Sequence, residues 1–77
     1  MANVLVYSKD HCPYCVKLKA FLKENNVKYT EYNVEQDKSK AAEMVEKTGQ
    51  MGVPVIDIDG TLIVGFDKEA VSKALKL

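Results

Sequence analysis

The stretch that decides the fold is Val4-Leu5-Val6-Tyr7-Ser8-Lys9-Asp10-His11-Cys12-Pro13-Tyr14-Cys15. Its first four residues are apolar and β-prone, which is typical of a central strand covered on both faces. Proline is favoured in the first turn of a helix, because its missing N–H would have no partner there. The stretch therefore predicts a strand over 4–7, a polar turn over 8–11, and a helix that begins at Pro13 and continues to about Asn25.

Both cysteines of the chain lie at this predicted helix start. Cys12 is expected at the N-cap, where free backbone N–H groups and the positive end of the helix dipole favour a thiolate. Cys15 lies three residues on, on the same side of the helix. A strand, a turn with an activated thiol and a second thiol within reach together indicate a dithiol redox site.

Cys12 and Cys15 have two other interpretations, a structural bridge and a metal site. A structural bridge across two intervening residues would contribute little chain-entropy stabilisation. Zinc needs four ligands, which this pair and the adjacent His11 do not supply within one chain. Redox chemistry is the favoured interpretation, and a metal or iron–sulfur cluster bridging two chains is the alternative.

The size and composition of the chain exclude several classes of protein. With 77 residues, one domain over 1–77 is expected. Eleven basic and eleven acidic side chains give a formal net charge of zero, which does not suggest a nucleic-acid surface. No apolar run approaches the roughly 20 residues that span a bilayer, and the N-terminus lacks a signal-like segment. We therefore expect a cytoplasmic monomer, in a compartment where thiols stay reduced.

The rest of the chain predicts three more strands and two more helices. In the first helix, one face holds Tyr14, Cys15, Leu18, Phe21 and Leu22, and the lysines form a solvated face. The range 27–34 is typical of an edge strand. Glu35-Gln36-Asp37 opens a second helix, in which Glu43 and Lys47 are spaced for an i,i+4 pair and which ends at Gly49.

The last third of the chain has clear turn and cap signals. Asp59-Gly60 between the strand-like runs 55–58 and 61–64 is a strong hairpin signal. Asp67 is expected to cap the last helix. The first two strands should be parallel and the hairpin antiparallel. The expected fold is α/β, a four-stranded mixed sheet with three helices and the cysteines at the carboxyl end of the first strand, where open α/β sheets bind ligands.

Four features resemble the glutaredoxins of the thioredoxin-fold superfamily, and the likeness extends over essentially the whole chain. Residues 9–15 match K-x-x-C-P-Y-C, and Thr48-Gly49-Gln50 with Val53-Pro54 resembles T-G-Q-x-x-V-P. The hairpin at 59–60 follows, and Gly65 stands where the family has a Gly-Gly turn. The resemblance implies a thioredoxin-like fold in the order β-α-β-α-β-β-α.

This resemblance implies a thiol–disulfide oxidoreductase that binds no cofactor, uses glutathione as co-substrate and acts on disulfide-containing proteins. Cys12 would be the nucleophile and Cys15 the resolving thiol. The resemblance also assigns a glutathione site. Lys9 and Tyr14 would lie beside the glutathione sulfur. Pro54, as a cis-proline, would let the Val53 backbone pair with the tripeptide. The γ-glutamyl end of glutathione would meet a helix N-terminus at Gly65, Phe66 and Asp67.

The residues alone leave simpler roles open for the same positions. Lysines scatter over every small surface, so Lys9 is either a thiol neighbour or a solvated residue. Tyr14 is either part of the core or a wall of the substrate site. Only about one X-Pro bond in twenty is cis, so the expectation for Pro54 depends on the family. Residues 65–67 are first of all a turn and a helix cap.

Four positions depart from the glutaredoxin pattern. Gly52 stands where the family usually has Thr or Ser, Met51 where it often has Arg, Val64 where it has the first Gly of the pair, and Lys68 where Asp is common. Gly65-Phe66 before the last helix resembles the corresponding sequence of the glutaredoxin-like electron donors of ribonucleotide reductase. Thioredoxin reductase reduces these donors, which usually lack Pro-Tyr between their cysteines. Such a donor is the first alternative function, and an iron–sulfur cluster carrier is the second.

Overall fold

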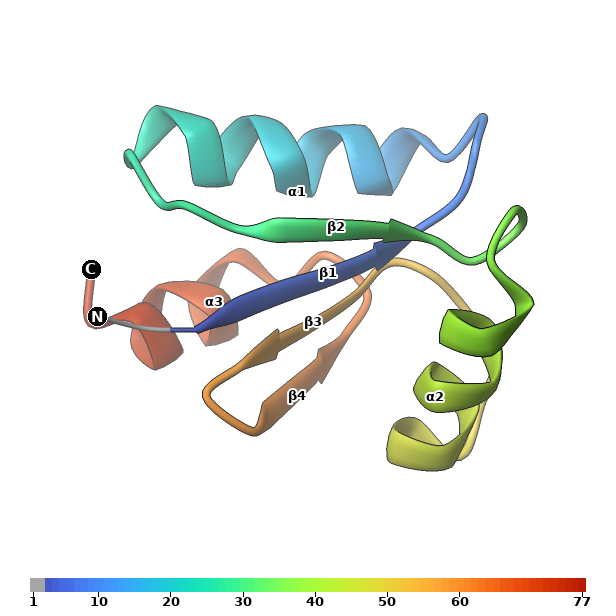
Figure 1. Ribbon diagram of the computed structural model, residues 1–77. Coiled ribbons are helices and arrows are strands. Elements are labelled where there is room, and N and C mark those ends of the chain that lie inside the picture. The colour runs from blue at the N-terminus through green and yellow to red at the C-terminus, as the bar shows by residue number, and fades with distance from the viewer. Residues whose placement is uncertain (1–2) are drawn as a thin grey trace.

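The computed structural model describes residues 3–77, which fold into four strands and three helices (Figure 1). In chain order these are β1 (Val4–Ser8), α1 (Pro13–Glu24), β2 (Thr30–Asn33), α2 (Lys38–Thr48), β3 (Val55–Ile58), β4 (Thr61–Val64) and α3 (Lys68–Leu75). The order β-α-β-α-β-β-α is the one predicted from the sequence.

The four strands form one mixed sheet in the order β2-β1-β3-β4. β1 pairs with β2 in parallel and with β3 antiparallel, and β3 pairs antiparallel with β4. Tyr7 lies opposite Val55, which in turn lies opposite Val64. The carboxyl end of β1 is therefore at the same edge of the sheet as the start of β3 and the end of β4.

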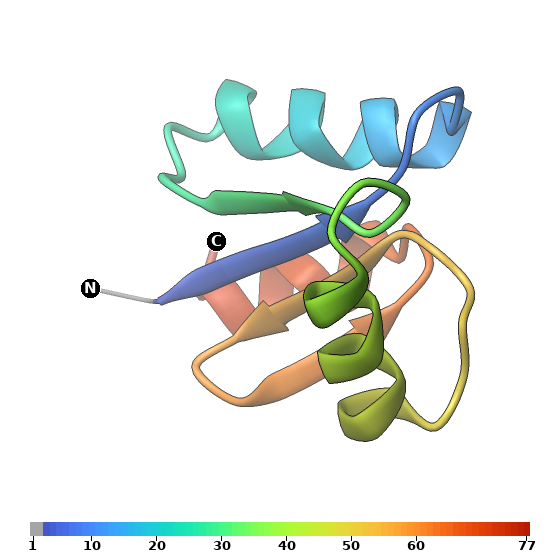
Figure 2. The ribbon, with the colours of Figure 1, turned by 45° about the vertical axis from the view of Figure 1, so that its right-hand side comes forward.

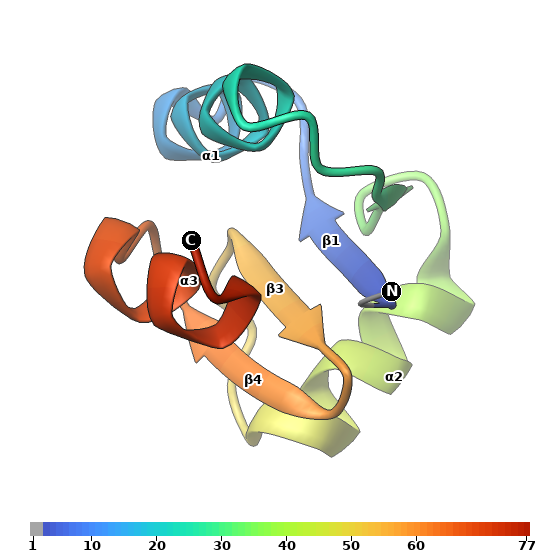
Figure 3. The same ribbon diagram turned by 90° about the vertical axis from the view of Figure 1, so that its left-hand side faces the viewer.

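Helices cover both faces of the sheet. α1 and α3 lie on one face and α2 on the other (Figure 3). Side chains alternate along β1, so that Val4 and Val6 join the core beneath α1 and α3, whereas Tyr7 joins a smaller cluster with Met44 of α2 and Val55. The run over 4–7 is buried on both sides, as its continuous apolar character predicted.

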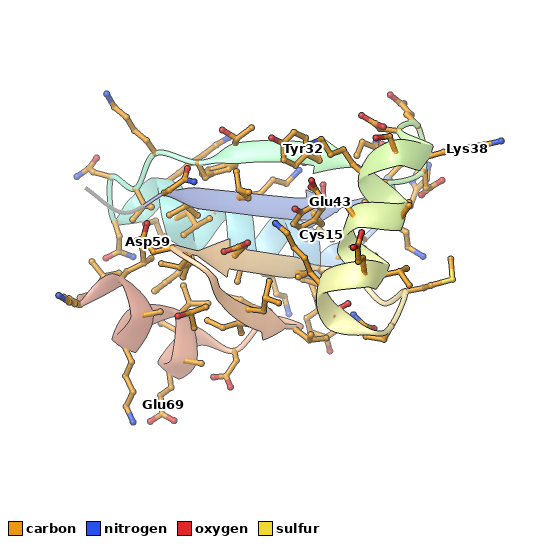
Figure 4. The ribbon with its side chains drawn as sticks, turned by 60° about the horizontal axis from the view of Figure 1, so that its bottom comes forward. Cys15, Tyr32, Lys38, Glu43, Asp59 and Glu69 are labelled. Carbon is orange, nitrogen blue, oxygen red and sulfur yellow. The ribbon has the colours of Figure 1, made fainter. Side chains whose placement is uncertain are left out.

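α2 packs on the sheet through one buried apolar side chain and a set of charged groups. Met44 is its only buried residue. The Lys47 ammonium donates to Asp57 of β3 and to the Tyr7 hydroxyl, both at 3.0 Å. The Tyr7 hydroxyl donates to Glu43 at 2.7 Å, and Figure 4 shows Glu43 between α2 and the sheet. The expected pair between Glu43 and Lys47 is wrong, because the buried Asp57 needs a cation and Lys47 supplies it.

Several predicted element boundaries also need correction. Ser8 ends β1 instead of starting the turn, and β2 covers only Thr30–Asn33 of the expected 27–34. α2 begins at Lys38, not at Glu35. The Asn33 side chain accepts the N–H groups of Glu35 and Gln36, at 2.9 and 3.3 Å. These bonds hold a turn there, and Asp37 then caps the helix.

The hairpin between β3 and β4 is the two-residue turn that the sequence predicted. Asp59 and Gly60 both have positive φ, at 51° and 93°. This is the pattern of a type I′ turn, whose twist matches that of the flanking strands. The Asp57 carboxylate accepts the Gly60 N–H at 2.8 Å and supports the turn from the strand.

Within residues 3–77, no helix is long and apolar enough to cross a membrane.

Candidate functional site

Three loops meet at the edge of the sheet where β1 ends. They are residues 9–12 before α1, residues 49–54 between α2 and β3, and residues 65–67 between β4 and α3. Figure 2 shows the first two at the same end of the molecule. The Gly65 N–H donates to the Pro54 carbonyl at 2.7 Å and ties the second loop to the third. The fold thus brings every predicted site segment to one edge.

Cys12 is the N-cap of α1, as predicted. Its backbone is extended, with φ −109° and ψ 104°, and its sulfur accepts the Cys15 N–H at 3.2 Å. Pro13 follows at the first helical position. The Cys12 sulfur therefore accepts an amide hydrogen bond at the positive end of the α1 dipole, the kind of position at which reactive cysteines are found.

The two cysteines differ in their burial. Cys12 keeps 8 % of its surface exposed and Cys15 only 1 %, and both are free thiols. Burial raises the pKa of the Cys15 thiol to about 11, and its hydrogen bond with Cys12 acts in the same direction; the Lys9 backbone and the charge of Lys19 act against it. Cys15 is therefore a protonated thiol at neutral pH, protected from other molecules but beside the Cys12 sulfur.

The residues flanking the cysteines are exposed. Tyr14 exposes 59 % of its surface, so its ring is not part of the core. The Lys17 ammonium lies 5.2 Å from the centroid of its ring. Lys9 and His11 are exposed as well, and His11 has a positive φ of 58°. Exposed aromatic and basic residues therefore lie within three positions of Cys12 or Cys15 in the chain.

The Val53–Pro54 peptide bond is cis, as the family resemblance implied. Pro54 is buried and Val53 is half-buried. Within residues 3–77, neither the N–H nor the C=O of Val53 has a hydrogen-bond partner. These two groups are available to pair with a bound chain.

Residues 65–67 form a turn and a cap, which was the simpler interpretation of this segment. Gly65 has φ 82°, a conformation that glycine adopts most easily. Asp67 accepts the Ala70 N–H at 3.1 Å and caps α3. The Phe66 ring packs edge-on against Phe21, with 6.2 Å between the centroids, so its side chain serves the core.

One group of residues near the cysteines was missed at the sequence level. The buried Ser8 hydroxyl donates to Glu31 at 2.7 Å, and the Lys19 ammonium donates to the same oxygen at 2.8 Å. The Lys19 bond and then the Ser8 bond lower the pKa of Glu31, and the Glu31 bond raises the pKa of Lys19. Lys19 is thus not part of a wholly solvated lysine face. The available signal was a hydroxyl directly after the apolar run of β1.

Besides the cysteines, a metal-binding cluster or a surface groove could mark a functional site. No group of three or more His, Cys, Asp or Glu residues within 3–77 is placed to hold a metal ion. An open groove of about 570 Å³ lies away from the cysteines, at the end of β2 and the start of α2; it is lined by Glu31, Tyr32, Asn33, Gln36, Asp37 and Lys38.

Comparison with known proteins agrees with this geometry. The sequence model of the glutaredoxin family matches residues 4–63. The chain is 41 % identical over 73 residues to a glutaredoxin-like 8.6 kDa protein of the rubredoxin operon of Clostridium pasteurianum, covering 95 % of this chain and 97 % of that one. It is 40 % identical over 67 residues to glutaredoxin 3 of Escherichia coli strain K12, covering 87 % and 81 % of the two chains.

A solved structure shares the fold. The crystal structure of a buckwheat glutaredoxin–glutathione complex superposes with a TM-score of 0.78 at 26 % identity, covering 97 % of this chain and 74 % of that one. The matched segment, the strand order and the Cys12–Cys15 pair at a helix start all agree with one family. The chain belongs to the glutaredoxin family of thiol–disulfide oxidoreductases.

Proposed function

We propose that the protein reduces protein disulfides and glutathione mixed disulfides through Cys12 and Cys15, with glutathione as its reducing co-substrate. The observation that carries this proposal is the contrast between the two cysteines: the Cys12 sulfur caps α1 in a residue that keeps 8 % of its surface exposed, whereas Cys15 is only 1 % exposed and burial raises the pKa of its thiol. A cytosolic location belongs to the same proposal, because glutathione and thioredoxin systems keep thiols reduced there.

The proposed cycle is two exchange steps. The Cys12 thiolate attacks one sulfur of a disulfide, a new S–S bond forms at Cys12, and the other sulfur leaves as a thiolate and takes up a proton. Cys15 then loses its proton and attacks the Cys12 sulfur, which releases the reduced target and leaves an intramolecular disulfide. Two molecules of glutathione restore the dithiol and leave as oxidised glutathione. The helix start serves both steps, because it favours Cys12 as an attacking thiolate and as a leaving group.

The proposed glutathione contacts lie at the edge where the three loops meet. Lys9 and Tyr14 would flank the sulfur, the free backbone groups of Val53 would pair with the tripeptide, and residues 65–67 would receive its γ-glutamyl end. The existence of a buckwheat glutaredoxin–glutathione complex supports glutathione as the ligand. We also propose that the protein acts as a monomer with no bound cofactor.

A test of this function combines two variants. Cys12→Ser should abolish reduction of every disulfide, because no nucleophile remains. Cys15→Ser should stop reduction of protein disulfides but spare deglutathionylation, which needs one thiol. Turnover is followed as NADPH consumption with glutathione and glutathione reductase. Equal loss of both activities in Cys15→Ser would contradict the division of roles.

A second candidate is a redoxin that thioredoxin reductase regenerates. The observation that favours it is the exposure of two apolar side chains, Met51 at 76 % and Val64 at 51 %, at positions where the family pattern has Arg and Gly. An exposed apolar rim suits a protein partner better than a charged tripeptide. Turnover with thioredoxin reductase and NADPH, and none with glutathione, would favour this candidate over the first.

A titration with glutathione followed by NMR gives an independent test of the binding site. Shifts of the amide signals of Val53, Gly65 and Asp67 at millimolar glutathione would support the proposed contacts. Shifts confined to residues near Cys12, with none in these loops, would contradict them.

A further inference from the structure

The loop from Gly49 to Pro54 is held at both of its ends. At the start, the Gln50 N–H donates to the Thr48 hydroxyl at 3.3 Å, and that hydroxyl lies 3.0 Å from the Gln50 carbonyl oxygen. At the end, the Pro54 carbonyl accepts the Gly65 N–H. Between these anchors, every hydrogen bond of residues 51–53 within the described chain comes from the side chain of Gln50.

The Gln50 side chain makes two hydrogen bonds to the backbone of Gly52. Its Oε1 accepts the Gly52 N–H at 2.6 Å, and its Nε2 donates to the Gly52 carbonyl at 3.0 Å. We call this arrangement the Gln50 clamp. It satisfies the donor and the acceptor of Gly52 as a neighbouring strand would. The next residue, Val53, keeps both of its backbone groups unpaired within residues 3–77.

The clamp explains why residue 52 is glycine. Gly52 does not have a left-handed φ, so its backbone conformation does not require glycine. A Cβ at this position would lie 2.6 Å from Gln50 Oε1, and the three nearest atoms all belong to the Gln50 amide group. That amide is the far end of a flexible side chain and would swing away. A larger residue at 52 would therefore fit, but it would displace the amide and break both hydrogen bonds of the clamp.

We propose that the Gln50 clamp selects extended peptides that carry the target disulfide, with Gln50 as a positioning residue for the Val53 backbone. The proposal rests on the proposed function, in which the Val53 backbone pairs with the bound chain. The clamp fixes residues 52 and 53 before binding, so the ordering of this loop does not oppose association. The binding mode is addition of a strand, whose affinity comes from main-chain hydrogen bonds. A small disulfide without amide groups gains nothing from the clamp.

The test uses three disulfide probes with the reduced protein in single turnover. The first is a disulfide-linked dimer of a short acetylated and amidated peptide, with one cysteine flanked by valines. The second is the same peptide with N-methyl groups on the residues that flank the cysteine. The third is bis(2-hydroxyethyl) disulfide, which has no amide. Acid quenching and chromatography give the limiting rate and the half-saturating concentration for each probe.

Four variants separate the clamp from general effects. Gln50→Met has a similar length but no amide, and Gly52→Ala displaces the amide. Gln50→Glu keeps the acceptor for the Gly52 N–H and loses the donor. Gln36→Met is the matched control, since Gln36 is exposed and its side chain makes no hydrogen bond within residues 3–77.

Gln50→Met and Gly52→Ala should raise the half-saturating concentration of the unmethylated peptide about tenfold, the scale of two neutral hydrogen bonds. The limiting rate should stay within about twofold, and the preference over the methylated peptide should disappear. The half-saturating concentration of the unmethylated peptide for Gln50→Glu should lie between the values for these variants and the value for the wild type. The reaction with bis(2-hydroxyethyl) disulfide should stay the same in all four variants, which also shows that they are folded.

Two results would overturn the proposal. Equal slowing of all three probes in the clamp variants would mean that Gln50 only stabilises the fold. Equal reaction of the methylated and unmethylated peptides with the wild-type protein would mean that Val53 pairs with neither. Failure of the wild-type protein to reduce even bis(2-hydroxyethyl) disulfide would overturn the proposed function itself, and so is distinguishable from failure of the clamp.

Discussion

Cys12 and Cys15 are only three residues apart, yet the start of α1 gives their sulfurs different surroundings. Cys12 is outside the helix and its sulfur accepts an amide hydrogen bond, whereas Cys15 is inside the first turn and faces the core. The protein obtains two thiols with different chemistry from one helix start.

This difference predicts which thiol an alkylating reagent modifies. At pH 8, a Cys15 thiol with a pKa of about 11 is ionised in only about one molecule in a thousand. Brief treatment of the reduced protein with iodoacetamide should therefore modify Cys12 and leave Cys15 unmodified, with modification of Cys15 rising only toward pH 11. Mass spectrometry of peptides measures the site. Modification of Cys15 before Cys12 at pH 8 would show that the two roles are assigned in the wrong order.

At the scale of elements, the attachment of α2 depends on charged groups that cross from helix to sheet. Asp57 stands in the middle of β3, and only 11 % of its side chain is exposed. Lys47 reaches it from α2, and its bonds to Tyr7 and Asp57 raise the pKa of Lys47 above its ordinary value. A carboxylate at this depth is stable only when a cation accompanies it. The position of α2 also determines where the loop to Pro54 begins.

Removal of this cation should destabilise the fold. Lys47→Met leaves the Asp57 carboxylate without its partner, and we expect the free energy of unfolding to fall by about 2 kcal/mol. This loss is smaller than for a fully buried pair, because Lys47 is partly exposed. Urea denaturation measures the change. Lys38→Met is the control, because Lys38 is exposed and points away from the sheet at the start of α2 (Figure 4), and its effect should stay within about 0.5 kcal/mol.

The double variant Lys47→Met/Asp57→Asn tests the cause of that loss. If the unpaired carboxylate is responsible, the double variant should be less destabilised than the sum of the two single variants. Strict additivity would mean that Lys47 and Asp57 do not act as a pair.

The group around Glu31 joins β1, α1 and β2, and it predicts a dependence on pH. Its bonds to Lys19 and Ser8 lower the pKa of Glu31, so the folded protein releases this proton more readily than the unfolded chain. The stabilisation of the fold by ionised Glu31 is fully present above the ordinary carboxylate pKa of about 4.3. It is lost as the pH falls through the lowered pKa of Glu31.

The wild-type protein should therefore exceed Glu31→Gln in free energy of unfolding by more at about pH 6 than at about pH 3. Urea denaturation at several pH values measures the difference. Glu24→Gln is the control, because Glu24 is exposed and forms no ion pair within residues 3–77. A gap between wild type and Glu31→Gln that stays constant with pH would exclude a charged role for Glu31.

At the scale of the whole molecule, the sequence predicts the sheet, the three helices and the edge where the cysteines lie. The reason is that these features depend on short-range signals. The apolar run over 4–7, Pro13 after a capping residue, and Asp59-Gly60 each specify a local conformation. Once these are in place, a parallel first pair and an antiparallel hairpin leave few topologies.

The features that sequence reasoning missed depend on contacts between distant residues. Helical spacing predicts a pair between Lys47 and Glu43, four residues earlier, but in the structure Lys47 of α2 pairs with Asp57 of the sheet. Tyr14 shares the spacing of the inward face of α1, which left a core role and a place at the substrate site both open, and the structure exposes its ring. The Gln50 clamp depends on the conformation of a loop, which periodicity does not describe.

The most direct test of the account is to trap the first intermediate. Cys15→Ser and Cys12→Ser are each incubated in the reduced state with oxidised glutathione at pH 7, and the mixed disulfides are located by peptide mass spectrometry. We predict rapid formation of one mixed disulfide on Cys12 of the first variant and almost none on Cys15 of the second. A mixed disulfide that forms on Cys15 as fast as on Cys12 would contradict the assignment of Cys12 as the attacking thiol.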